Sequence, residues 1–265
     1  MKKCLSIIIC FALSLSFFFH LPITSVAAES KEQYLIGKGL SEEIVYDCSD
    51  VVLDKLYETL YGENKILLSV DSSEMSETSL TRGTIDPSMM KLLVVAAADV
   101  TTVNNQDRID DVVVVVCSTW YECPKIRWTD KIAVNWDASV FTYKANSFSL
   151  SCYDHNEDYS RTVYHSSTTL KTLTQGGMGY DVPLTPSNND ALEIESVASF
   201  VLLPANGPIY QSTGYSTTAI NAEYAHDKNL FTGDFSFTIS GVFVSMSPSG
   251  FWDSTSTAAN IYYKN

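Results

Sequence analysis

Apolar and polar residues alternate along much of the chain after residue 109, and this is the pattern of β-strands. Residues 235–240 read Phe-Ser-Phe-Thr-Ile-Ser, which would put apolar side chains on one face of a strand and hydroxyls on the other. Residues 112–116 are five consecutive valines and predict a strand that is covered on both faces. Shorter strands are expected near residues 140–143, 148–152, 161–165, 168–174, 192–203, 215–225, 242–246 and 258–263.

Turn-forming residues separate these segments, for example Gly176 with Gly177 and the stretch Pro-Ala-Asn-Gly-Pro at 204–208. Because many short strands follow one another without helices between them, the sequence predicts a mainly β fold over residues 85–265. Such a pattern is typical of an antiparallel sandwich or barrel, and of the two we expect the antiparallel β-sandwich.

The strongest helical pattern lies ahead of the strands, over residues 42–61. Its apolar side chains recur at spacings of three and four residues, and Gly62 follows where a helix usually ends. The apolar stripe consists of Val52, Leu53, Leu56, Tyr57 and Leu60. We therefore expect an N-terminal amphipathic helix that either packs on another part of the protein or is bound by a partner.

An acidic segment rich in serine and threonine, residues 71–84, has the composition of an exposed linker. With the helix it makes up an N-terminal segment, residues 29–84, that either covers the main domain or is a pro-segment released near Arg82. The general rarity of pro-segments favours the covering role. Residues 89–98 fit a short helix and a strand equally well, so the sequence leaves that choice open.

Residues 1–28 have the three parts of a secretory signal peptide. Lys2 and Lys3 form a positive start, an uncharged apolar stretch covers residues 5–21, and Ser-Val-Ala-Ala at 25–28 offers small residues for cleavage. The apolar stretch approaches the ~20 residues that span a bilayer, but Pro22 and the small residues favour cleavage over a membrane anchor. We therefore expect a secreted, extracellular protein with no transmembrane segment after signal cleavage.

The chain is acidic, with 17 lysines and arginines against 31 aspartates and glutamates. Removal of residues 1–28 removes two lysines and no acid, which leaves 15 basic residues and a net charge of −16. Binding to DNA, RNA or anionic lipid requires clustered lysine and arginine to neutralise phosphates. The charge balance therefore argues against nucleic acid as a partner.

Four cysteines follow the predicted signal: Cys48, Cys117, Cys123 and Cys152. An even number in an exported chain permits two disulfides, with three connectivities. A local bond between Cys117 and Cys123 is the first to expect, because it would close a short loop over residues 118–122 if these turn a hairpin. Four thiols without a disulfide are the alternative, and the sequence does not separate the two.

Two patches of sequence carry a resemblance. One runs through residues 120–124 (Trp-Tyr-Glu-Cys-Pro), 127–130 and 135–137 (Asn-Trp-Asp), and the other is residues 221–226, ahead of the strand expected at 235. The chain resembles exported β-rich proteins of Gram-positive, spore-forming bacteria over about residues 85–265. The resemblance implies an extracellular location, and it brings no catalytic residue that can be carried over.

Trp120, Tyr121 and Trp128 surround the loop expected between two strands. Aromatic rings flanked by Asn, Asp and Ser suit a sugar-binding face, because sugar C–H groups stack on the rings while hydroxyls meet polar side chains. These three residues are the candidate ligand-binding set, for a glycan or a cell-surface ligand. The competing interpretation is core filling, which we expect for Trp136.

Asp154, Asn156 and Asp158 present oxygen ligands at alternate positions, as at the start of an EF-hand calcium loop. Tyr159 stands where such a loop has glycine, and His165 stands where a glutamate closes the ligand shell. The three residues are therefore candidates for an irregular calcium site only, against the interpretation as a solvated turn. The sequence indicates no other cofactor.

No motif for catalysis stands out, since the sequence contains neither G-x-S-x-G nor H-E-x-x-H. We therefore expect a non-catalytic extracellular binding or surface-interaction module, with a secreted hydrolase as the alternative. A β-pore-forming toxin is a third hypothesis, because residues 160–174 are rich in hydroxyls and could form an amphipathic hairpin.

Overall fold

A computed structural model describes residues 29–73, 89–121, 123–124, 128–156, 160–186, 191–227, 237–240, 243–246 and 252–264. The predicted signal peptide and residues 74–88, which include most of the predicted linker, lie outside the described residues. Contacts divide the chain into residues 1–30 and residues 31–265, and the fold given below is that of the second part. In the described part no helix is long and apolar enough to cross a membrane.

Among the described residues three short helices precede the strands: α2 (Lys31–Gly37), α3 (Glu42–Asp47) and α4 (Asp50–Leu60). In place of one helix over residues 42–61 there are two, and Ser49 explains the break. Its hydroxyl accepts a hydrogen bond from Val52 N at 3.2 Å, so it is the N-cap that starts α4 anew.

Most of the described chain is β-structure, and its strands are antiparallel. Twelve of the described strands belong to one sheet, while two short ones, β12 and β13, pair only with each other. The strands are β1 (Lys65–Ser72), β2 (Met90–Val103), β3 (Gln106–Trp120), β4 (Thr129–Asn135), β5 (Phe141–Tyr143), β6 (Ser149–His155), β7 (Arg161–Ser167), β8 (Thr172–Leu173), β9 (Gly177–Pro183), β10 (Glu193–Pro204), β11 (Ile209–Asp227), β12 (Phe237–Ser240), β13 (Phe243–Met246) and β14 (Trp252–Lys264).

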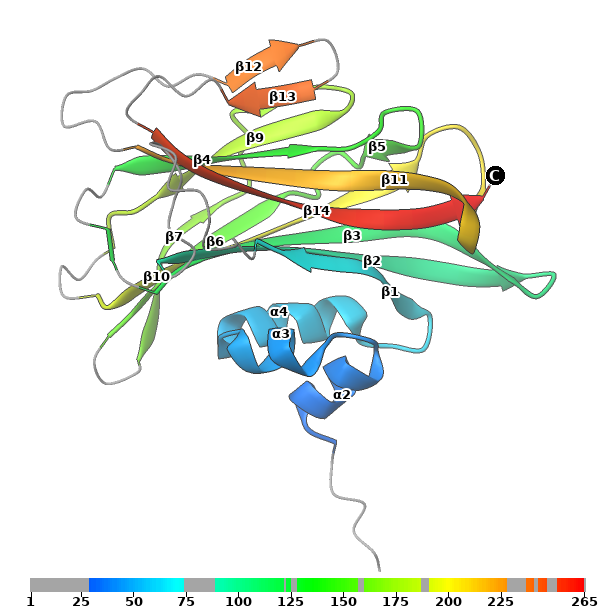
Figure 1. Cartoon of the computed structure of the whole chain (residues 1–265), viewed down its shortest axis with the longest axis horizontal. Coiled ribbons are helices and arrows are strands. Elements are labelled where there is room, and N and C mark those ends of the chain that lie inside the picture. Colours follow the sequence, from blue (N-terminus) through cyan, green and yellow to red (C-terminus); the bar gives the residue numbers. More distant parts are fainter. Residues whose placement is uncertain are drawn as a thin grey trace, which may run out of the picture. The chain divides into compact units, whose positions relative to one another are not determined.

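Two runs of strands can be followed within the large sheet (Figure 1). One has the order β7-β6-β10-β3-β2-β1, and the other has the order β14-β11-β4-β9-β8. They join where Ile209 and Tyr210 of β11 pair with Ile109 and Arg108 of β3. The molecule therefore has one curled antiparallel sheet, and the two separate sheets of the predicted sandwich are not confirmed.

A side chain also links the two runs on their other side, where β1 lies close to β14. Asp71 of β1 accepts hydrogen bonds through Oδ2 from Thr257 Oγ1 at 2.8 Å and from Ala258 N at 3.1 Å. The carboxylate thus ties a strand from the N-terminal part of the fold to the last strand of the sheet.

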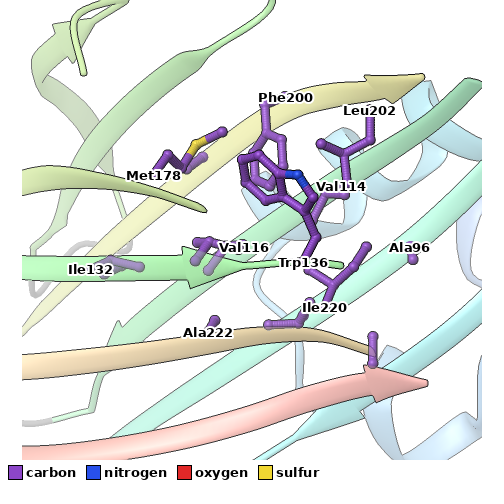
Figure 2. Packing of buried hydrophobic residues seen from close by; sticks show 14 of the residues in the cluster. Ala96, Val114, Val116, Ile132, Trp136, Met178, Phe200, Leu202, Ile220 and Ala222 are labelled. Atoms are coloured by element: carbon purple, nitrogen blue, oxygen red, sulfur yellow. The ribbon is translucent and has the colours of Figure 1, made fainter. Parts of the chain in front are cut away.

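The inner face of the sheet, toward which both runs direct side chains, holds the larger core. Trp136, which follows β4, is buried there together with Phe200, Leu202 and Met178 (Figure 2). The burial expected for Trp136 is therefore confirmed.

The opposite face of the same sheet, called the helix-side face below, packs against α2, α3 and α4 (Figure 1). Alternate residues of β3 point to opposite faces of the sheet, since Val114 and Val116 belong to the inner core and Val115 to the helix-side cluster. The strand predicted at 112–116 is thus confirmed as covered on both faces. Residues 89–98, for which helix and strand fitted equally, belong to β2 from Met90 onward and likewise alternate between the two clusters.

The hairpin on which the toxin hypothesis rested is not formed. β7 pairs with β6, whereas β8 pairs with β9. The two halves of residues 160–174 therefore have different partners, because each strand completes its hydrogen bonds with a different neighbour in the sheet.

Candidate functional site

A groove of about 730 Å³ opens between two segments that are distant in the strand order. One wall is formed by residues from the end of β5 and the turn that follows, and the other by five residues between 168 and 175, a stretch that includes β8. The lining residues are Thr142, Tyr143, Ala145, Asn146, Thr168, Leu170, Leu173, Thr174 and Gln175.

The first wall is fixed by hydrogen bonds within and beside the turn. Asn146 has a φ of 62°, a left-handed conformation that asparagine adopts more readily than most residues. Phe148 N donates to the Tyr143 hydroxyl at 3.1 Å, and Val201 N donates to Ser147 Oγ at 3.0 Å. The Tyr143 ring is therefore held in place before any ligand arrives.

The second wall is anchored in the inner core. Trp136 Nε1 donates to the carbonyl oxygen of Gln175 at 3.0 Å, and Trp136 N donates to that of Gly176 at 2.9 Å. Thr174 N donates to the carbonyl oxygen of Gly177 at 2.8 Å, which closes the turn between β8 and β9. Both walls are thus preorganised by backbone contacts.

Among the described residues that line the groove there is no lysine, arginine, histidine, aspartate or glutamate. Threonine hydroxyls and the amides of Asn146 and Gln175 supply donors and acceptors. Tyr143 and Leu173 supply apolar surface, and Leu173 is 48 % exposed. Uncharged polar groups beside exposed apolar groups suit a neutral ligand that is rich in hydroxyls.

A second groove, of about 670 Å³, runs beside β14 and has a different character. Two carboxylates, Asp71 and Glu223, stand among its lining residues. Asp71 is already engaged by β14, as described above. This groove is therefore an acidic seam between strands and does not share the neutral lining of the first.

A buried polar network occupies one end of the inner core. Trp120 Nε1 donates to the Tyr224 hydroxyl at 2.8 Å, and that hydroxyl donates to Asp130 Oδ2. His226 Nδ1 lies 3.0 Å from both carboxylate oxygens of Asp130, and its ring lies 4.9 Å from the Trp120 ring. All four side chains are buried. Burial first, and then the Asp130 charge, raise the pKa of Tyr224 well above its usual value, so its hydroxyl stays protonated and donates.

A second buried carboxylate, Glu195, lies on the helix-side face. It accepts hydrogen bonds from Ser49 Oγ at 2.7 Å and from Thr119 Oγ1 at 3.1 Å. His155 Nε2 lies 3.5 Å from its Oε2. Because Ser49 caps α4, this cluster fastens the helices to the sheet. Neither this cluster nor the Asp130–His226 pair lines either of the two grooves, so these contacts give the hydrolase alternative no support.

The three aromatic residues predicted to bind a sugar are not brought together. Trp120 is only 3 % exposed and belongs to the inner core. Tyr121 is half-buried on the other side, where its hydroxyl lies 3.3 Å from Asp47 Oδ2. Trp128 is 46 % exposed. The reason is that β3 continues to Trp120, so neighbouring residues that were taken for a loop point in opposite directions.

The residues of the predicted calcium site also lie apart. Asp154 is buried on the inner face, and neither of its carboxylate oxygens has a hydrogen-bond partner in the described part. Asn156 lies in the turn after β6, where its amide donates to Ser160 Oγ at 3.2 Å, and Asp158 lies outside the described residues. Among the described residues there is no group of three or more His, Cys, Asp or Glu able to hold a metal ion. Calcium binding stays a prediction.

The predicted bond between Cys117 and Cys123 is not formed, and the four described cysteines contain no disulfide. Cys117 belongs to the helix-side cluster, whereas Cys123 packs against the inner core. The two side chains are therefore on opposite faces of the sheet. No hairpin spans residues 118–122, because β3 runs through Trp120.

The residues of the neutral groove were missed by sequence reasoning. The turn at Asn146 could have been noticed, because asparagine is enriched where the backbone is left-handed. The second wall carries no comparable signal, since threonine, leucine and glutamine occur there in an ordinary strand and turn.

No protein-family profile and no curated protein matches the chain. Solved structures give distant matches. A chain named BspA_C_mut is 10 % identical with a TM-score of 0.33; the match covers 64 % of this chain and 54 % of that one, so this chain spans about half of its length. The KRT10-binding region domain of the pneumococcal serine rich repeat protein PsrP is 13 % identical with a TM-score of 0.26, covering 60 % of this chain and 88 % of that one.

A third match is the carbohydrate-binding module TmCBM27, studied for specific mannan recognition. It is 10 % identical with a TM-score of 0.20, and the match covers 56 % of this chain and 84 % of that one. At these TM-scores the likenesses carry no argument about the fold or the function of this chain, so the function has to be argued from the site.

Proposed function

We propose that this protein is a non-catalytic extracellular binding module that takes an uncharged glycan in the groove beside Tyr143 and Leu173. The observation that carries the proposal is the neutral lining of this groove in a chain with a net charge of −14. Acidic residues are abundant in this chain, yet none of the nine described lining residues is acidic, so the groove does not repel a ligand through its own charge.

The size and the rigidity of the groove fit this role. Ligand sites usually enclose about 300–1,000 Å³, so the volume here is of the ordinary size for a small saccharide. Preformed walls reduce the ordering that binding would require, and this favours affinity. Tyr143 offers a ring for stacking with sugar C–H groups, while the threonine hydroxyls and the two amides are placed to pair with sugar hydroxyls.

The overall charge adds a preference among glycans. Anionic saccharides are repelled by the net negative field of the protein, and none of the described lining residues carries a positive charge that would offset this repulsion. On an array of neutral and acidic oligosaccharides we expect binding to be confined to neutral members. Retention only of acidic members, or of none, contradicts the proposal.

The substitution Leu173→Asp tests the groove directly. It places a charge in the neutral lining while removing a side chain that is already 48 % exposed, so we expect at least a tenfold loss of affinity for the bound saccharide and an unchanged fold. The matched control is Leu192→Asp, because Leu192 is 51 % exposed and lies outside the groove. Calorimetric titration measures the affinity of both variants for the saccharide. Equal affinities of the two variants would show that the ligand binds elsewhere.

The extracellular location is part of the proposal and has its own test. It is supported by the tripartite pattern of residues 1–28. When the whole chain is produced in a Gram-positive host, we expect the product in the medium to begin at or near Glu29, as read by mass spectrometry of its N-terminal peptide. Full-length chain that keeps Met1 inside the cells contradicts the prediction.

A further inference from the structure

The sheet divides the four cysteines into two pairs, one pair for each face. From this division we infer that oxidation joins Cys48 to Cys117 and Cys123 to Cys152. Of the three connectivities that four cysteines allow, this is the one in which neither bond has to pass through the sheet.

Cys48 is held against the helix-side face by the residues on both sides of it. Asp47 forms an ion pair with Lys91 of β2. Ser49 donates to Glu195 of β10 at 2.7 Å. The backbone at Cys48 therefore runs above the strand between them, which is β3, and its thiol is half-buried in the layer between helices and sheet.

The register of the strands places Cys117 next to this position. Lys91, Thr119 and Glu195 lie side by side across β2, β3 and β10, and the adjacent row on the same face is Leu93, Cys117 and Val197. Cys117 is 2 % exposed and belongs to the same cluster against which Cys48 packs. Burial first, and then the neighbouring Cys48 thiol, raise the pKa of Cys117 well above its usual value. The two thiols thus share one buried space.

The other two cysteines belong to the inner face. Cys152 is fully buried in the inner core, and Cys123 packs against the same core. Tyr164 packs against this core as well, and, after burial, the thiols of Cys152 and Cys123 both contribute to raising the pKa of its hydroxyl. The alternative connectivities would join side chains on opposite faces, which point apart, whereas a disulfide needs Cβ atoms about 4 Å apart.

The reaction is thiol–disulfide exchange with a small-molecule disulfide such as oxidised glutathione. The thiolate of one cysteine attacks the glutathione disulfide and releases one reduced glutathione. The thiolate of its partner then attacks the mixed disulfide and releases the second. Formation of each protein disulfide thus releases two thiol protons and two electrons. The electrons reduce one glutathione disulfide, and the protons pass to the two glutathione molecules that result.

Burial decides when this exchange can occur. It raises the pKa of Cys48 from 9.0 to about 11 and that of Cys152 from 9.0 to about 12. At neutral pH the folded protein therefore has about a hundredfold less Cys48 thiolate than the unfolded chain, and the thiolate is the attacking species. We expect the bonds to form during folding, when the thiols are still accessible, and to form slowly in a protein that has folded reduced.

The test is a disulfide map of the chain from Glu29, which contains the whole described fold. The reduced, denatured chain is refolded in reduced and oxidised glutathione, remaining thiols are alkylated, and the protein is digested. Trypsin alone leaves Cys117 and Cys123 on one peptide, so chymotrypsin is added to cut after Trp120 and Tyr121. Mass spectrometry is expected to find Cys48 linked to Cys117, and Cys123 linked to Cys152, as the dominant species.

A dominant link between Cys117 and Cys123, any other link between the two faces, or four alkylated thiols would each overturn the inference. Two matched variants test each pair of cysteines separately. Cys48→Ser should leave Cys117 as a thiol with the Cys123–Cys152 bond intact, and Cys123→Ser should do the reverse. A Cys117–Cys123 link in the Cys48→Ser protein would show that the sheet does not keep the two pairs apart. If a variant fails to fold, the map of the unaltered chain still decides.

Discussion

Replacing Trp136 with alanine is expected to lower the free energy of unfolding by about 3–5 kcal/mol. The side chain is 1 % exposed, and its ring lies 5.9 Å from that of Phe200. Around it pack residues from several strands, among them Leu202 and Met178 (Figure 2). Because these strands are fixed by their hydrogen bonds, the core cannot collapse into the space that the indole leaves.

The same substitution is expected to weaken glycan binding. The indole N–H of Trp136 donates to the carbonyl oxygen of Gln175, so its loss removes one of the hydrogen bonds that anchor the second wall of the groove. Urea unfolding measures the stability loss, and calorimetric titration measures the affinity. Trp128→Ala is the control, because Trp128 is 46 % exposed, and a change within about 0.5 kcal/mol is expected there. Equal effects of the two substitutions would mean that Trp136 does not fill the core.

The substitution Asp130→Ala is expected to lower the free energy of unfolding by about 2–5 kcal/mol, because it leaves two buried polar groups without their hydrogen-bond partner. The Tyr224 hydroxyl loses its acceptor, and His226 Nδ1 loses the carboxylate that faces it at 3.0 Å. Neither group can turn to solvent, since both side chains are buried. Thermal unfolding followed by circular dichroism should show the melting temperature of the variant lowered by several degrees.

Asp137→Ala is the matched control for this carboxylate. Asp137 is exposed, and within the described part of the chain its carboxylate is hydrogen-bonded to Ser139 of its own turn, so its loss should change stability little. The variant Asp130→Asn should fall between the two, because its amide oxygen still accepts from Tyr224 while the amide nitrogen replaces one carboxylate oxygen. An unchanged melting temperature of Asp130→Ala would show that water reaches the buried network.

Much of the β-structure could be predicted from the period of two. The five valines at 112–116 predicted a strand that is buried on both faces. The apolar stripe of the helical segment packs on one of these, the helix-side face. The joining of the two runs by β11 could not be predicted. This strand pairs with β3 at its start and with β4 and β14 farther along, and its sequence pattern does not change where the partner changes. The split of the helix at Ser49 needed the capping geometry.

The candidate sites were predicted less well, and the cause is local. Whether a residue such as Trp120 or Tyr121 faces the core or the helices depends on where β3 ends, and a shift of one residue reverses the answer. The cysteine at 117 was paired with Cys123 for the same reason. The neutral groove depends on bringing residues 142–146 beside residues 168–175, and only the tertiary fold does so.

The hydrogen bonds of Asp71 have a consequence for the order in which the molecule can assemble. Their partners, Thr257 and Ala258, come 186 and 187 residues later in the chain. During synthesis the carboxylate therefore cannot reach these partners until the chain as far as Ala258 has emerged. Contacts so remote in sequence slow folding. The contact between β1 and β14 is accordingly among the last in the described sheet that can form, and before it forms β1 is held by its pairing with β2 and the helices by their packing on β2, β3 and β10.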